Sequence, residues 1–169
     1  ANVADDIIGT SIHLMLEELQ PNLWEANLER CVDYGHTFSP TVEMKALPEL
    51  LHGEAVCVDM ALSSVLSFHR GNMTQEELYH VLSIMYSLDL PIWNSALEEP
   101  SVLNVALADT IRHRGGKQRI PLPIGIGDYK FANDVSEDEI THALNTLRTG
   151  GKTAALETVR ELGQKYEVG

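Results

Sequence analysis

The sequence is poor in positive charge. Its 169 residues include 12 Lys and Arg against 25 Asp and Glu, which gives a formal net charge of −13. Nucleic acid is therefore disfavoured as a partner, because a phosphate backbone attracts a cationic surface. A run of eighteen apolar residues is also missing, so we expect no transmembrane helix and no membrane partner.

Cysteine is scarce as well. The two cysteines, Cys31 and Cys57, lie in apolar surroundings. This favours reduced, buried thiols in a cytoplasmic protein over a disulfide. The first six residues, Ala-Asn-Val-Ala-Asp-Asp, form neither a signal peptide nor a start at methionine. We therefore expect a cytoplasmic chain that is a segment of a longer protein.

The residues that are present predict one mainly α-helical domain over 1–169. Apolar residues make up 44% of the chain and no low-complexity tract interrupts them, so the chain is long enough to bury a core. Apolar positions recur at helical spacing in most segments. The predicted helices are 3–19, 23–32, part of 41–51, 54–70, 74–87, 102–112, 136–147 and a terminal helix at 152–167.

Two further features refine this prediction. Segments 119–124 and 129–131 are typical of a small β-hairpin, the only strand-like part of the sequence. Segment 54–70 is apolar on nearly every side, which predicts a buried central helix. The domain is thus expected to be helical, with one hairpin and one buried helix at its centre.

The chain is organised around two histidine motifs, Asp-Tyr-Gly-His-Thr-Phe-Ser-Pro at 33–40 and His-Gly-Glu-Ala-Val at 52–56. On one continuous helix, His36 and His52 would lie roughly 24 Å apart. Proline and glycine residues make such a helix improbable, so two separate elements can bring the imidazoles together. Two histidines are a partial zinc site, because a catalytic zinc has three protein ligands. The alternative is that each is an ordinary hydrogen-bonded histidine.

A basic segment interrupts the acidic chain. Arg112, Arg114 and Lys117 lie within six residues, with His113 and two glycines among them. Cationic side chains beside free backbone amides suit a phosphate, which makes these three residues candidate phosphate ligands. The alternative is a solvated loop. The Gly-x-Gly at 125–127 lacks the third glycine and the βαβ setting of a dinucleotide fingerprint.

The two motifs, their separation and the later Pro-Leu-Pro-Ile-Gly segment resemble the dehydroquinate synthase-like sugar phosphate cyclases over roughly residues 5–145. The resemblance implies the helical C-terminal domain of such an enzyme, in which His36 and His52 bind a catalytic Zn²⁺ or Co²⁺. It places the third ligand, a glutamate, upstream of this chain, together with an NAD-binding domain that the chain lacks. It also implies a homodimer, a sugar phosphate substrate and NAD as a cofactor.

Departures from the dehydroquinate synthase pattern narrow the resemblance. That subfamily has a histidine at Pro40 and an asparagine at Asp33, and its Asp-Lys-Lys falls on residues 110–112, where only Arg112 is basic. Asp33 together with His113 instead resembles the 2-epi-5-epi-valiolone synthases, which use sedoheptulose 7-phosphate. Desmethyl-4-deoxygadusol synthases have Ala and Thr at these positions. Asp33 and His113 are therefore candidate catalytic residues.

Other interpretations of the same residues stay open. Dehydroquinate synthase and desmethyl-4-deoxygadusol synthase are the alternative activities. Asp33 alternatively caps the helix expected near Gly35. The chain by itself is alternatively an inert helical module that binds metal or a partner. A zinc hydrolase using the two histidines lacks a His-Glu-x-x-His signature.

Overall fold

The fold is mainly helical, as the sequence predicts. The computed structural model describes residues 2–151, which contain six α-helices and one two-stranded sheet. The helices are α1 (Val3–Leu19), α2 (Ser39–Ala46), α3 (His52–His69), α4 (Gln75–Ser87), α5 (Pro100–His113) and α6 (Glu137–Thr146), and the strands are β1 (Ile120–Ile124) and β2 (Asp128–Ala132). Short 3₁₀ turns lie at Gln20–Asn22, Cys31–Asp33 and Ser95–Glu98, and a π-helical turn at Leu147–Gly151.

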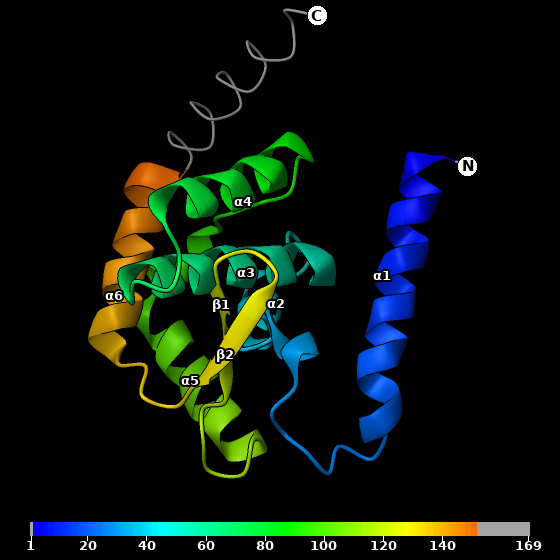
Figure 1. The fold of residues 1–169 in the computed structure, drawn as a ribbon. Coiled ribbons are helices and arrows are strands. Elements are labelled where there is room, and N and C mark those ends of the chain that lie inside the picture. The colour runs from blue at the N-terminus through cyan, green and yellow to red at the C-terminus, as the bar shows by residue number, and fades with distance from the viewer. Residues whose placement is uncertain (1, 152–169) are drawn as a thin grey trace, which may run out of the picture.

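Helix α3 forms the centre of the domain (Figure 1). It is covered by α2, α4, α6 and β1. Its residues Ala61, Leu62 and Val65 are at most 1% exposed. The prediction of a buried central helix is confirmed, and the reason is that apolar residues occur on all of its sides. Because the second histidine motif opens α3, the best-packed element of the domain holds His52.

Local signals set the helix starts. At α4 the Thr74 hydroxyl accepts a hydrogen bond from the Glu77 amide at 3.2 Å, and the Glu77 carboxylate accepts one from the Thr74 amide at 2.7 Å. Ser136 and Glu139 repeat this arrangement at α6. These capping boxes satisfy amides that have no partner within the helix, so both predicted starts are correct.

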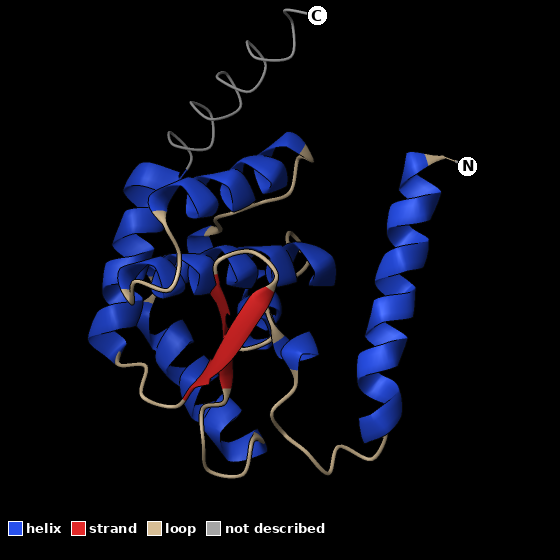
Figure 2. Ribbon diagram, viewed as in Figure 1, coloured by secondary structure: helices blue, strands red, loops and turns tan. Residues whose placement is uncertain are grey.

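The hairpin is antiparallel and lies in front of α3 (Figure 2). Ile120 pairs with Ala132 and Ile124 with Asp128. Gly125 and Gly127 have φ of +57° and +100°, values that glycine adopts at little cost. The Gly-x-Gly sequence therefore makes a tight turn, which explains why it is not a dinucleotide fingerprint.

The prediction of a helix over 23–32 is wrong. After the 3₁₀ turn the chain is irregular as far as Arg30. The Asn22 side chain donates to the Asn27 carbonyl and accepts from its amide at 3.0 Å, and Glu25 has φ of +51°. Asparagine side chains that bond nearby backbone groups compete with helix formation. The predicted terminal helix at 152–167 lies outside the described residues.

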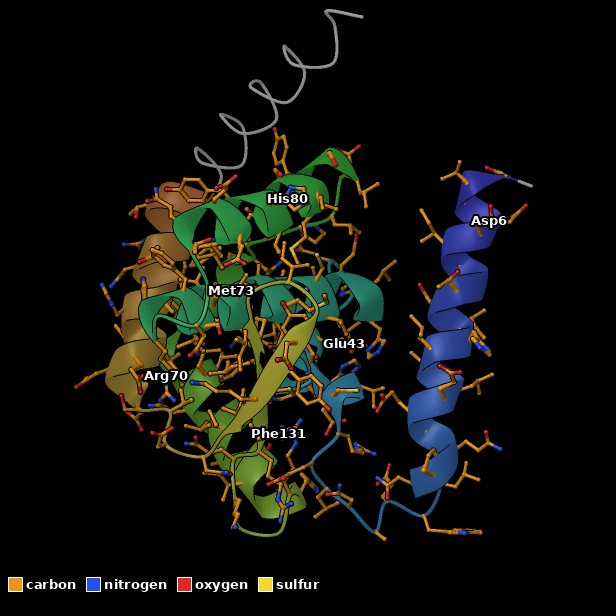
Figure 3. The ribbon with its side chains drawn as sticks, viewed as in Figure 1. Asp6, Glu43, Arg70, Met73, His80 and Phe131 are labelled. Carbon is orange, nitrogen blue, oxygen red and sulfur yellow. The ribbon has the colours of Figure 1, made fainter. Side chains whose placement is uncertain are left out.

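Helix α1 stands apart from the other helices (Figure 1). None of its described residues is buried, and Ile7, Ile8 and Leu16 are each more than half exposed. Asp6 projects from its surface in Figure 3. Within residues 2–151, no helix combines the length and apolar character needed to cross a bilayer.

Candidate active site

The loop that carries His36 packs directly on α3. Gly35 has φ of +80°, and a Cβ there would lie 2.6 Å from Met60 Cγ and 2.9 Å from Val56 Cγ1. Both the backbone conformation and the close approach thus require glycine. The loop is held against the central helix immediately before the histidine.

A buried aspartate fixes the other side of the loop. The Asp59 side chain, on α3, accepts hydrogen bonds from the amides of Phe38 and Ser39, the latter at 2.8 Å, and from the Ser63 hydroxyl at 3.1 Å. Burial raises the pKa of Asp59, and these hydrogen bonds partly oppose the rise. The first turn of α2 is therefore capped by Asp59 and not by Asp33.

The structure brings His36 and His52 together. Their ring centroids are 5.7 Å apart with an interplanar angle of 56°. Two imidazoles with nitrogens about 2.1 Å from a shared zinc have ring centres about 5 to 6 Å apart. The separation therefore suits two ligands of one ion.

Each of these rings is anchored through its other nitrogen. His36 Nδ1 lies 3.2 Å from the Tyr34 carbonyl, and His52 Nδ1 lies 2.9 Å from Glu43 Oε2. Such contacts fix the tautomer with hydrogen on Nδ1 and leave Nε2 as the ligand atom. Among the described residues, no group of three His, Cys, Asp or Glu could hold a metal ion. The pair can therefore supply two of the three protein ligands of a catalytic zinc.

A cavity of about 460 Å³ lies beside His36. Its lining includes Asp33, His113 and Arg114 together with His36, so four of the predicted site residues share one space. A cavity of this size suits a small ligand. His52 is not part of the lining and approaches the site through its contact with the His36 ring.

Asp33 is held between two arginines. It is 6% exposed, and its carboxylate lies 2.7 Å from Arg30 Nη2 and 3.4 Å from Arg114 Nη2. Burial lowers the pKa of the Arg114 guanidinium, and the Asp33 carboxylate opposes that effect. The alternative role for Asp33, capping a helix near Gly35, is not what the structure shows, because its carboxylate faces these guanidinium groups.

The fold places the basic residues of 112–117 in different surroundings. Arg112 has a 70% exposed side chain, pairs with Asp109 at 2.8 Å and is absent from the cavity lining. Lys117 is exposed and also absent from the lining. Arg114 lies in the cavity wall but is buried. Of the three predicted phosphate ligands, only Arg114 shares the cavity with His36 in this chain.

Sequence reasoning missed three polar residues that build this site. Glu43 contacts His52, Arg30 contacts Asp33, and the Thr110 hydroxyl donates to the Thr37 carbonyl at 2.8 Å. Arg30 precedes Asp33 by three residues, a spacing that signals a local ion pair. Glu43 and Thr110 join segments distant in sequence and carry no comparable local signal.

The model of the 3-dehydroquinate synthase C-terminal family matches residues 1–111. The chain belongs to this family.

Relatives named for different activities differ in their sequence identity to this chain. It is 54% identical over 160 residues to a 2-epi-5-epi-valiolone synthase of Streptomyces albus, covering 95% of this chain and 39% of the relative. It is 36% identical over 142 residues to a demethyl-4-deoxygadusol synthase of Trichormus variabilis, covering 84% of this chain and 34% of the relative. The chain thus spans well under half the length of these relatives.

A solved member of the family has the same fold. ValA, the 2-epi-5-epi-valiolone synthase of Streptomyces hygroscopicus subsp. jinggangensis, superimposes with a TM-score of 0.83 at 57% identity. The match covers 85% of this chain and 39% of the ValA chain. The ValA structure has NAD⁺ and Zn²⁺ bound.

Proposed function

We propose that this chain is the C-terminal metal- and substrate-binding part of a sugar phosphate cyclase that converts sedoheptulose 7-phosphate to 2-epi-5-epi-valiolone with release of phosphate. The observation that carries the proposal is the cavity in which Asp33 and His113 meet His36. The same two positions mark the resemblance to valiolone synthases. Relatives with that name at 50–59% identity support it.

The metal ligands in this chain are His36 and His52, with Zn²⁺ as the ion and Co²⁺ as a substitute. A divalent metal supplies Lewis acidity, which lowers the pKa of a bound alcohol and stabilises developing oxyanions. The two Nε2 atoms are presented for this purpose by the hydrogen bonds at Nδ1. A third ligand, a carboxylate, comes from a part of the enzyme outside this chain.

Asp33 and His113 contact the substrate in this proposal. Asp33 is a fixed hydrogen-bond acceptor in the cavity wall, three residues before His36, so it binds a hydroxyl near the metal-bound end of the sugar. His113, at the end of α5, approaches the cavity from another element and binds a hydroxyl or moves a proton. An anionic Asp33 also repels the carboxylate of the dehydroquinate synthase substrate.

NAD is the redox cofactor in the proposal, because hydride transfer needs one. The Gly-x-Gly of this chain lies in a hairpin turn and is not a dinucleotide fingerprint. NAD therefore belongs to an N-terminal domain that completes the enzyme. We also propose a cytoplasmic homodimer as the assembled form, by analogy with the family.

The test is an assay of the enzyme that carries this chain. Sedoheptulose 7-phosphate and 3-deoxy-arabino-heptulosonate 7-phosphate are each supplied with NAD and zinc, and the carbocycle is identified by mass spectrometry and NMR. We expect conversion of the first to 2-epi-5-epi-valiolone, and no dehydroquinate from the second. Dehydroquinate as the main product would overturn the proposal and would identify the enzyme as a dehydroquinate synthase.

A double variant tests the roles of the two residues. Asp33→Ala with His113→Thr removes the carboxylate and the imidazole from the cavity wall. We expect a loss of 2-epi-5-epi-valiolone with a shift toward desmethyl-4-deoxygadusol, because a site that loses its hydroxyl partners also loses discrimination. Wild-type rate and product in this variant would show that Asp33 and His113 do not determine specificity.

The second candidate function is a module without catalytic activity. It is favoured by the absence, within residues 2–151, of a three-ligand metal group. The two functions are separated by adding the N-terminal domain of the enzyme to this chain in trans. We expect cyclase activity to return, whereas an inert module would bind its partner without turnover.

A further inference from the structure

Arg114 is the most heavily bonded side chain of the cavity wall. It follows α5 and is 8% exposed. Its Nη1 donates to the carbonyls of Gln118 and Arg119 at 3.2 and 2.9 Å. Its Nη2 donates to the His36 carbonyl at 3.2 Å and lies 3.4 Å from Asp33 Oδ2. Both terminal nitrogens are thus committed to groups of the protein.

These contacts join the first histidine motif to the segment between α5 and β1, far along the chain. Asp33 and His36 belong to the first histidine motif, Arg114 follows α5, and Gln118 and Arg119 lead into β1. The guanidinium is planar and presents its donors in a fixed fork, so it defines where each acceptor sits. The backbone of the metal ligand and the carboxylate beside it are therefore fixed by one side chain.

We propose that Arg114 is a positioning residue that fixes Asp33 and the His36 backbone, and that it does not bind the substrate phosphate. This inference rests on the proposed function. A phosphate ligand needs free donors, and both terminal nitrogens of Arg114 already have partners. Other cationic groups of the assembled enzyme take the phosphate.

Lysine and methionine at position 114 would each remove a different property of the arginine. A lysine keeps the positive charge beside Asp33, but its single ammonium cannot reproduce the planar fork that reaches four acceptors. A methionine removes the charge and keeps most of the volume. Comparing Arg114→Lys with Arg114→Met therefore separates the geometry of the guanidinium from its charge.

The first measurement is the zinc affinity of the enzyme that carries this chain, by competition with a chromophoric chelator. We expect Arg114→Lys to weaken zinc binding by about tenfold, as other changes behind metal ligands do. Inorganic phosphate binding, measured by ³¹P NMR, should not change. A phosphate ligand would give the reverse pattern, weaker phosphate binding with unchanged zinc affinity, and that result would overturn the inference.

The matched control is Arg70→Lys. Arg70 is also a largely buried arginine, with an 18% exposed side chain that pairs with Asp134 and Glu139 at 2.7 Å each. It follows the C-terminal end of α3, whereas Glu43 lies toward the end where His52 is found (Figure 3). We expect this variant to keep wild-type zinc affinity. That result would show that loss of a buried arginine does not by itself weaken the metal site.

A second measurement decides the inference without metal. The unfolding equilibrium in urea is measured for Arg114→Lys, Asp33→Asn and the double variant. Residues in direct contact are non-additive, so we expect a coupling of about tenfold in the unfolding equilibrium constant. Additive effects would overturn the positioning role. A wild-type enzyme that takes up no zinc would refute the proposed metal centre, and this coupling would then decide the inference alone.

Discussion

At the scale of single residues, the site is defined by what stands behind the functional groups. His36 and His52 are each held at Nδ1, and Asp33 is held by Arg30 and Arg114. A ligand or hydrogen-bonding group that is fixed in advance loses less freedom when it binds. The supporting residues therefore matter nearly as much as the groups that touch metal or substrate.

Glu43 offers a direct test of this support. Glu43→Gln keeps the shape of the side chain but weakens the bond to His52 Nδ1, and we expect the zinc affinity of the enzyme that carries this chain to fall by about tenfold or more. Exposure of the two side chains, 26% for Glu43 and 64% for His52, argues for the low end of that range. The measurement is a chelator competition.

The control for this change is Glu49→Gln. Glu49 is an exposed glutamate that follows α2, the helix that contains Glu43. The control substitution removes the same charge from the same part of the sequence, and zinc affinity should stay at the wild-type value. Equal loss of affinity in both variants would mean that Glu43 acts through general charge and not through His52.

At the scale of elements, the first histidine motif is a loop pressed onto α3. Gly35→Ala places a methyl group within 3 Å of Met60 and Val56 and forces alanine to a φ of +80°. Overpacking and the left-handed conformation each cost about 1 to 2 kcal/mol or more, so we expect the free energy of unfolding to fall by at least about 2 kcal/mol. Urea unfolding of the chain measures this.

Gly9→Ala is the matched comparison. Gly9 lies within α1, and no atom lies within 4 Å of a Cβ added there. Alanine is favoured over glycine inside a helix by about 0.5 to 1 kcal/mol, so this variant should be neutral or more stable. A Gly35→Ala variant as stable as wild type would show that the loop does not pack on α3 as described.

The attachment of α6 to α3 predicts a pH dependence of stability. The Arg70 hydrogen bond is the main reason that the pKa of Glu139 falls from 4.5 to about 2. A carboxylate whose folded pKa is depressed stabilises the fold above its unfolded pKa. That stabilisation is therefore complete above about pH 4.5 and is lost as pH falls toward about 2. Solvent exposure of the pair keeps the effect modest.

Urea unfolding of wild type and Glu139→Gln across this range checks the sign. The difference in stability between the two should shrink as pH falls from about 4.5 to about 2. Glu137→Gln, in the same turn of α6, serves as the control. A difference that stays constant with pH would contradict the assigned pKa of Glu139.

Periodicity and caps made most of these elements predictable. Helix α3 is apolar on all sides, and α4 and α6 begin at capping boxes, so local sequence was sufficient there. The helix that the sequence predicts over 23–32 does not form, because hydrogen bonds between Asn22 and Asn27 hold the backbone in an irregular conformation there. The two partners of Asp33 differ in how predictable they are. Arg30 is three residues away and can be predicted from the sequence, whereas Arg114 lies far along the chain and is brought to Asp33 only by the fold.

At the scale of the whole molecule, residues 2–151 form a well-packed core beside which α1 stands apart. Among residues 2–151, α1 keeps its apolar side chains exposed, while α3 to α6 and β1 bury most of theirs. The cavity lies at the edge of that core, on loops and helix ends that the core positions. Such placement combines a rigid support with access for a ligand.

The central claim is that His36 and His52 are ligands of one metal ion beside the cavity that holds Asp33 and His113. Anomalous diffraction at the zinc edge, from crystals of the enzyme that carries this chain, tests it most directly. The account predicts one peak about 2.1 Å from both Nε2 atoms, with Glu43 still bonded to His52. A peak at other residues, or at only one of the two histidines, would contradict it.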